Sequence, residues 1–436
     1  MQEHASRPLV LTGARLLDPA SGLDEKGDVV VQDKTIRHVG GHDDKVADAL
    51  RVDCSGLCLC PGLVDMRACL CEPGFEHNET IASGSSAAVA GGVCSVLCAS
   101  NTQPVIDRVE LVGFIQRRSR EAAYAKIYPC AALTRQALGA DITDIGLLQE
   151  AGALAFGDSW RYVANSRVMR QALSYARGFD ALVMQHAQET SLSADGVMNE
   201  GALATRLGLE GTPAVAESIA LERDVRLLRD VGGRYHASHI TTADSVAIIA
   251  EAKAQGLSIT CDTAPPYFML NEHAVGNYRT YARMNPPLRQ EYDRLAIIDG
   301  LCSGVIDAIA SDHCPYDRES KRLPFEQAAP GSVGLETLLS LVLHLYYDGK
   351  MTLLDALSKV THLPASLLGL DAGALRVGAC ADLVLFALDE SWRVDADKLV
   401  SRSSNTAFDG MMMQGRVRAT FIDGRLVYRG VPLRKK

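Results

Sequence analysis

The chain has 436 residues, of which 47% are hydrophobic and 22% are charged, and its formal net charge is −9. This composition is that of a globular protein, and the length exceeds one ordinary domain but fits a barrel with a smaller domain attached. The acidic balance, with no basic stripe to offset it, argues against nucleic acid as a partner, and no apolar run reaches the roughly 18 residues of a membrane span. Since the N-terminal residues show no signal-peptide pattern, we expect a cytoplasmic protein.

Strand-like segments dominate both ends of the chain. Short alternating runs occupy residues 9–12, 28–31 and 35–39, and similar runs return at 382–386 and 417–422. Asp423-Gly424 is a hairpin signal between the last of these and another apolar run. We therefore predict a composite β-sandwich domain built from residues 1–58 and 371–436.

The middle of the chain, residues 59–370, alternates short apolar runs with amphipathic stretches. Candidate strands are residues 95–98, 181–184 and 257–260, and candidate helices are 166–177, 213–231 and 242–255. Repeated strand–helix units imply a parallel sheet, and about 300 residues of them fit a (β/α)8 barrel. The predicted fold class is thus α/β, a TIM-like barrel with the composite β domain beside it.

The chain has twelve cysteines, and we expect them to be reduced thiols rather than a disulfide framework. Most of them should fill small apolar core positions. Five of them cluster between residues 54 and 71, which raises the alternative of a thiolate zinc site. That cluster contains no C-x-x-C pair, and Cys58 and Cys60 stand in an apolar run, so the core interpretation is preferred.

In a barrel of this kind, chemistry is carried by polar groups at the carboxyl ends of the strands. The candidates at predicted strand ends are Arg67, Cys69, Asn101, Asp158, Ser159, His186, His239, Asp312 and His313. Several of them fall in a recognisable frame. Residues 61–74 read Pro-Gly-Leu-Val-Asp-Met-Arg-Ala-Cys-Leu-Cys-Glu-Pro-Gly.

This frame resembles the segment that opens the barrel of dihydroorotases, in which Pro-Gly-Leu-Val-Asp precedes a His-x-His pair and Leu-Arg-Glu-Pro-Gly. Further segments match the same family in order, at residues 196–201, 284–289, 310–315, 334–337 and 378–383. The resemblance covers nearly the whole chain. It implies a zinc-dependent cyclic amidohydrolase of pyrimidine biosynthesis, which interconverts N-carbamoyl-aspartate and dihydroorotate.

The resemblance also implies which residues would hold the metal. His186 and His239 match two ligands, and Asp312 matches the residue that is both ligand and catalytic acid or base. The other positions depart from the family: Arg67 and Cys69 replace the His-x-His pair, and Ser159 stands where a bridging carboxylate belongs. Asp158 comes one residue early, and such a shift turns a side chain to the other face of a strand.

The substrate positions are mixed in the same way. Asn101, Asn285, Pro330 and Gly331 match substrate-binding positions of the family. Cys71 replaces the arginine that grips the substrate carboxylate, which removes a bidentate clamp. Tyr316 replaces a second histidine of the segment that contains Asp312.

A guanidinium cannot shed its charge, so Arg67 would place a permanent cation where a dication belongs. We expect Arg67 to pair with Asp312 or Asp158, so that no metal cofactor is needed. The alternative is a rebuilt zinc site formed by Cys69, His186, His239 and Asp312, since a cysteine binds zinc well as thiolate.

The sequence therefore predicts a dihydroorotase-like chain with a degraded metal site. We expect it to be a non-catalytic subunit that supports an aspartate carbamoyltransferase catalytic chain, in a homo- or hetero-oligomer. One alternative is an active zinc-dependent cyclic amidohydrolase with a rewired site. Another is a regulatory module that binds a carbamoyl-aspartate-like or nucleotide ligand through Asn101 and Asn285.

Overall fold

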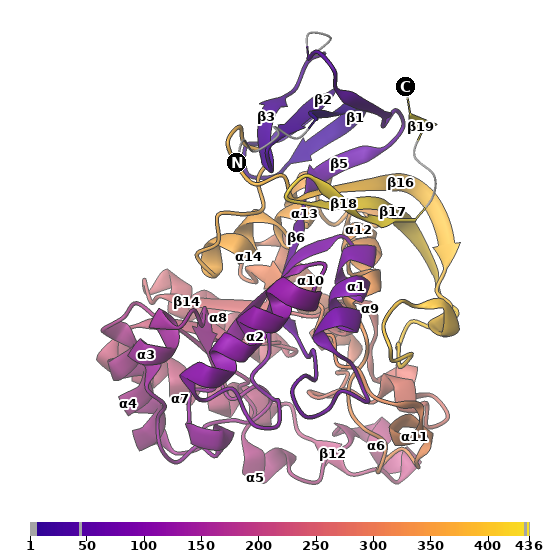
Figure 1. Ribbon diagram of the computed structural model, residues 1–436. Helices are drawn as coiled ribbons and strands as arrows, with labels where there is room; N and C mark the ends of the chain where they lie inside the picture. The colour runs from indigo at the N-terminus through magenta and orange to yellow at the C-terminus, as the bar shows by residue number, and fades with distance from the viewer. Residues whose placement is uncertain (1–6, 43–45, 431–433, 436) are drawn as a thin grey trace.

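The structure is a computed structural model that describes residues 7–42, 46–430 and 434–435. Figure 1 shows two parts, a large body of strands and helices and a β-sheet region that holds both ends of the chain. No helix in the described ranges is long and apolar enough to cross a membrane.

The large body is built on eight parallel strands that follow one another around the sheet in chain order. They are β6 (Leu63–Ala68), β7 (Val93–Cys98), β8 (Lys126–Ala131), β9 (Ala155–Phe156), β10 (Leu182–Gln185), β13 (Arg234–Ala237), β14 (Ile259–Thr263) and β15 (Ala308–Ile309). A bridge between Ala68 and His313 joins the end of the last strand to the first. The predicted (β/α)8 barrel is thereby confirmed.

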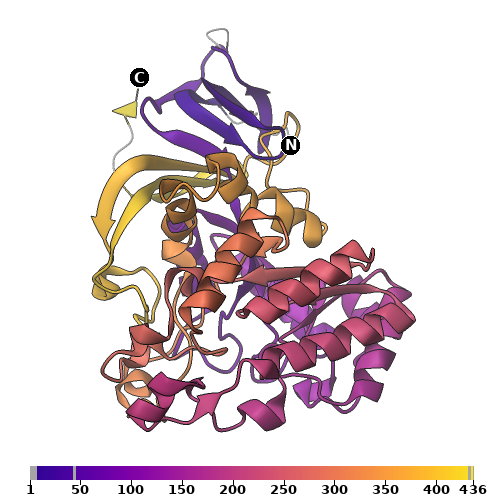
Figure 2. The same cartoon turned by 180° about the vertical axis from the view of Figure 1, so that it is seen from behind.

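Helices cover the outside of the barrel (Figures 1 and 2). The larger ones are α1 (Ile81–Ala90), α2 (Val109–Ala122), α3 (Ile145–Glu150), α4 (Ser166–Arg177), α7 (Val215–Val231), α8 (Ala243–Ala254), α10 (Glu291–Cys302) and α12 (Leu338–Tyr347). Side-chain caps fix where some of them begin. Asn165 accepts hydrogen bonds from the first backbone N–H groups of α4, and Thr242 does the same for α8.

Shorter elements fill the connections. The helices are α5 (Thr190–Ser193), α6 (Ala202–Leu207), α9 (Pro265–Met269), α11 (Arg318–Arg322), α13 (Leu353–Ser358) and α14 (His362–Leu367). Single 3-10 turns are η1 (Arg135–Ala137), η2 (Glu272–Val275), η3 (Thr280–Ala282), η4 (Leu335–Thr337) and η5 (Ala396–Lys398), and β11 (Met198–Asn199) pairs with β12 (Gly211–Thr212).

The β-sheet domain is a single nine-stranded sheet made from both ends of the chain. Its strands are β1 (Leu9–Asp18), β2 (Leu23–Gln32), β3 (Thr35–Val39), β4 (Leu50–Asp53), β5 (Cys58–Pro61), β16 (Leu383–Arg393), β17 (Met412–Ile422), β18 (Arg425–Arg429) and β19 (Arg434–Lys435). β5 lies between β1 and β16 and so joins the two ends. The predicted hairpin turn at Asp423-Gly424 is present, with φ angles of 49° and 71°. The exact domain boundaries, 58/59 and 370/371, stay a prediction.

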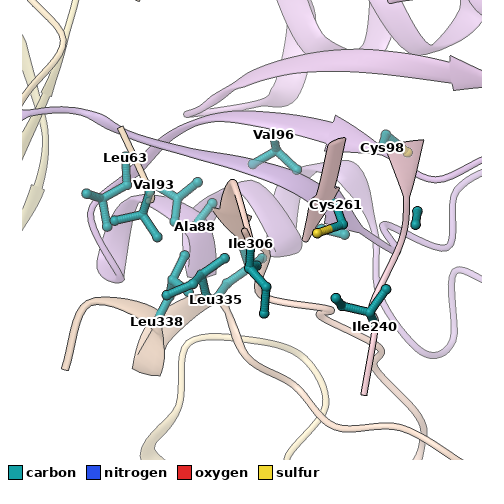
Figure 3. Packing of buried hydrophobic residues seen from close by; sticks show 14 of the residues in the cluster. Leu63, Ala88, Val93, Val96, Cys98, Ile240, Cys261, Ile306, Leu335 and Leu338 are labelled. Atoms are coloured by element: carbon teal, nitrogen blue, oxygen red, sulfur yellow. The ribbon is translucent and has the colours of Figure 1, made fainter. Parts of the chain in front are cut away.

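Apolar packing anchors the first barrel strand, which carries Arg67. Figure 3 shows Leu63 of β6 beside Val93 of β7, with Ala88 of α1 and Leu338 of α12 against them. These four side chains are fully buried and belong to one core cluster. Ten of the twelve cysteines are also buried, and all twelve are free thiols, as the composition predicts. A strand held this firmly fixes the direction of the side chains at its carboxyl end.

Candidate active site

Arg67 lies at the carboxyl end of β6, in the centre of the barrel mouth, with only 5% of its surface exposed. Its Nε lies 3.5 Å from Oδ1 of Asp312, and its guanidinium carbon lies 5.0 Å from the centre of the Trp160 ring. The first contact is an ion pair, and the second is a cation–π contact. Of the two partners predicted for Arg67, Asp312 is the one with which it pairs in the structure.

Asp158 does not pair with Arg67, so that alternative was wrong. Its carboxylate accepts hydrogen bonds from the backbone N–H and the hydroxyl of Thr134, which follows the neighbouring strand β8. The physical reason is the alternation of side chains past the end of β9, which turns Asp158 away from the barrel axis. Ser159 follows with a left-handed backbone (φ 58°) and a buried hydroxyl that has no partner among the described residues.

His239 links Asp312 to a second carboxylate. Its Nε2 lies 3.2 Å from Oδ1 of Asp312, and its Nδ1 lies 2.8 Å from Oδ1 of Asp262 on β14. Burial by itself lowers the pKa of His239, but the charges of Asp312 and Asp262 outweigh it and raise that pKa to about 9. Burial raises the pKa of Asp312, but His239 and then Arg67 hold it below its usual value. His236 contacts the other oxygen of Asp262 at 3.1 Å.

His186 stands apart from this chain of charges. Its Nε2 lies 2.8 Å from Oε1 of Gln188. Burial, and then the charge of Arg67, lower the pKa of His186 to about 3, so the imidazole is neutral at physiological pH. A neutral histidine beside a guanidinium fits an electrostatic arrangement in which Arg67 is the permanent cation.

Cys69 and Cys71 form a small apolar cluster with Ala99, and Trp160 packs against it. Burial raises the pKa of both thiols well above the ordinary value. Cys71 also carries no group that could replace the carboxylate clamp of the family.

A zinc ion is held by nitrogen, sulfur or oxygen donors that converge on one point. Within the described residues, no three or more His, Cys, Asp or Glu side chains gather as a group that could hold a metal ion. The guanidinium of Arg67 and protonated His239 already balance the carboxylates of Asp312 and Asp262.

None of the four predicted substrate residues lines the small cavities beside Arg67 and Asp312. Asn101 and Asn285 are half-buried. The carbonyl oxygen of Pro330 accepts from the Cys314 thiol, and Gly331 (φ 128°) donates its N–H to the Arg283 carbonyl. These two contacts use the Pro330 carbonyl and the Gly331 N–H within the protein.

Two small cavities border the charged residues. The one beside Arg67 and Ser159 measures about 20 Å³, and the one beside Asp312 about 10 Å³. Each holds about one water, whereas sites for small organic ligands measure about 300–1,000 Å³. This conformation therefore leaves no room at either place for a cyclic amide or for a regulatory ligand of similar size.

The prediction from sequence missed three site residues. Trp160 covers Arg67, and Asp262 and His236 extend the charge chain behind His239. Trp160 directly follows Asp158 and Ser159, where the sequence departs from the family's bridging carboxylate. Its place next to that departure could have marked it as a site residue. Asp262 and His236 lie on neighbouring strands, β14 and β13, and their meeting depends on strand register.

A parallel barrel with histidines and carboxylates at its strand ends, joined to a β-sheet domain from both chain ends, defines the class of barrel amidohydrolases. Comparison with known proteins agrees. A model described as "Dihydro-orotase-like" matches residues 56–245, and one described as "Amidohydrolase family" matches residues 199–428. Among solved structures, L-hydantoinase (dihydropyrimidinase) from Arthrobacter aurescens superposes with a TM-score of 0.86 at 21% identity, covering 98% of this chain and 97% of that one.

Relatives that are similar over nearly the whole chain identify the family within this class. The chain is 44% identical to a dihydroorotase of Pelobacter propionicus, over 97% of this chain and 99% of the relative. It is 43% identical to a dihydroorotase of Anaplasma phagocytophilum, over 95% of this chain and 94% of that one. The chain belongs to the dihydroorotase family.

Proposed function

We propose that this chain is a non-catalytic member of the dihydroorotase family, which supports an aspartate carbamoyltransferase catalytic chain in cytoplasmic pyrimidine biosynthesis. The observation that carries the proposal is the buried Arg67–Asp312 pair. By the resemblance, the guanidinium of Arg67 stands at the first histidine of the family's His-x-His pair, and it lies 3.5 Å from the carboxylate that matches the family's ligand and base.

Two further observations support the proposal. The cysteines Cys69 and Cys71 are buried in a small apolar cluster, and the Cys71 thiol has no group that could grip a substrate carboxylate. The cavities at Arg67 and Asp312 are of water size. Meanwhile the barrel around them is complete, as expected for a protein whose surface matters more than its pocket.

The test begins with the zinc content of protein purified without a chelator, together with turnover of dihydroorotate and N-carbamoyl-aspartate. We expect less than about 0.1 zinc per chain and no turnover. The second step mixes the chain with the aspartate carbamoyltransferase of the same genome. We expect a stable complex, and a higher thermal midpoint for the transferase within it, because binding to the native state stabilises it.

The second candidate is an active zinc-dependent amidohydrolase of the dihydroorotase type. It is favoured by the names of the relatives at 41–44% identity, and by the retention of His239 and Asp312. Its signature is one or two zinc ions per chain and a turnover that a chelator abolishes. That result would remove the non-catalytic proposal.

A further inference from the structure

Two cysteines lie side by side where the barrel closes. The end of β6 and the segment that follows β15 run parallel, and the bridge between Ala68 and His313 joins them. The Cys69 N–H donates to the His313 carbonyl at 2.8 Å, so Cys69 and Cys314 are the next residues along the two paired segments. Because side chains at one register position point to the same face of a sheet, the two thiols face each other.

The same register produces the ion pair at the barrel centre. Arg67 and Asp312 stand one residue before the bridge, and their side chains meet at 3.5 Å across the two segments. Cys69 and Cys314 stand one residue after the bridge, and their thiols share a hydrogen bond. The thiol contact and the ion pair are therefore successive side-chain contacts between the same two segments.

This arrangement meets the main spatial requirement of a disulfide. A disulfide joins residues whose Cα atoms lie roughly 4.4–6.8 Å apart, and neighbouring strands lie about 4.8 Å apart. Cys69 and Cys314 can therefore be bridged without a change of the strand pairing. The third thiol of this region, that of Cys71, lies 4.0 Å from the Cys69 carbonyl oxygen instead.

Burial decides which oxidant can reach the pair and which thiol reacts first. Cys69 is 1% exposed and Cys314 is 3% exposed, so the oxidant has to be about the size of a water molecule. Burial raises the pKa of Cys69, which makes its thiol the slower nucleophile. Cys314 interacts electrostatically with Lys321, and reactive cysteines are found in such electropositive surroundings. We therefore expect the first reaction at Cys314.

We propose that Cys69 and Cys314 form a redox-modification site, at which hydrogen peroxide oxidises the two thiols to an intramolecular disulfide. The Cys314 sulfur attacks one peroxide oxygen, so that an S–O bond forms, the O–O bond breaks and a water molecule leaves. The Cys69 sulfur then attacks the Cys314 sulfur, the S–S bond forms, the S–O bond breaks and a second water leaves. The two sulfurs lose two electrons to the peroxide, and the two thiol protons leave in the two waters.

The disulfide fixes the place where the barrel closes. It ties the end of β6 to the segment that carries Asp312, and the loop that it closes contains most of the barrel sequence. A cross-link over a long loop stabilises a protein mainly by constraining the unfolded chain. The oxidised protein should therefore unfold at a higher urea concentration than the reduced protein, and dithiothreitol should reverse the shift.

The test treats the full chain with hydrogen peroxide and then locates its thiols. Cys302 and Cys380 are exposed and react with peroxide by themselves, so a C302S/C380S background is used beside the wild type. The treated protein is unfolded with an alkylating agent that blocks the remaining thiols. Its proteolytic peptides are then mapped by mass spectrometry without reduction, and again after dithiothreitol.

We expect a cross-linked pair of peptides that contains Cys69 and Cys314 and has lost two hydrogen atoms, as the main oxidised product. The variant C69S should lose the cross-link and leave Cys314 as a sulfenic acid that dimedone traps. The matched control is C71S, which removes the neighbouring thiol and should keep the cross-link. Urea unfolding of the reduced variants verifies that they are folded.

Three results would overturn the proposal. In the first, Cys69 and Cys314 are recovered as free thiols while Cys302 and Cys380 of the wild type are oxidised. In the second, the cross-link contains Cys71. In the third, Cys314 is cross-linked in C69S. If C69S does not fold, C69A replaces it, and the peptide map of the wild-type chain decides by itself. The reaction does not require the transferase, so the proposed function is tested separately.

Discussion

The replacement of Arg67 by methionine is the most direct probe of the barrel centre. Methionine keeps much of the side-chain length but removes the charge, so Asp312 loses the cation 3.5 Å away. At an effective dielectric constant of about 20, a pair at that distance interacts by about 5 kcal/mol. His239, 3.2 Å from the same carboxylate oxygen, offsets part of the loss.

We therefore expect R67M to lower the free energy of unfolding by about 2–4 kcal/mol, somewhat less than the roughly 3–5 kcal/mol for breaking a buried pair, because His239 compensates part of the charge. The double variant R67M/D312N removes both charges, and its cost should fall short of the sum of the single costs by about 2 kcal/mol. Urea unfolding, followed by circular dichroism and by tryptophan fluorescence, measures the cost of R67M, of D312N and of the double variant. Trp160 packs over Arg67 and makes the fluorescence sensitive to this site.

Two results would refute the reasoning. A cost below about 1 kcal/mol for R67M would show that the charge of Arg67 is not needed by Asp312. Strictly additive single and double variants would show that the two side chains do not interact. A useful control is R170M, since Arg170 pairs with Asp230 on the surface, where a pair is worth about 0–1 kcal/mol.

Three more outcomes are expected. R67H/C69H should bind no zinc and show no dihydroorotase turnover, since the bridging carboxylate and the arginine clamp are still absent; turnover in that variant would show that the rest of the site is intact. Burial lowers the pKa of Lys321 to about 7. Between about pH 7 and 10 the unfolded chain therefore binds more protons than the folded chain, and the free energy of unfolding rises with pH. Lys321 thus destabilises the fold least at high pH. The stability gained by K321M should accordingly shrink by on the order of 2 kcal/mol from pH 7 to pH 10 in urea titrations, and a gap independent of pH would contradict this. G331A should cost on the order of 2 kcal/mol in the same assay, because φ is 128° and a Cβ would lie 2.7 Å from the Cys314 sulfur; an unchanged midpoint would count against it.

Much of the fold is determined by local patterns that the sequence shows directly. The helix predicted at residues 166–177 has those bounds, since Asn165 caps its start and apolar residues recur on one face. The strand predicted at 257–260 lies instead at Ile259–Thr263. Its position is set by pairing with β13 and β15, which no local pattern records.

The sequence by itself determined that Arg67 is a permanent cation, because a guanidinium stays charged in any environment. Its resemblance to the family predicts that Arg67 stands at a histidine position. The same resemblance predicts that Cys71 replaces the arginine of the carboxylate clamp. Only the tertiary structure decided that Asp312 rather than Asp158 faces Arg67, that Trp160 packs over Arg67, and that the cavities beside Arg67 and Asp312 are of water size. Those outcomes depend on strand register and on which way each strand end turns, and both are set by contacts between residues far apart in the chain.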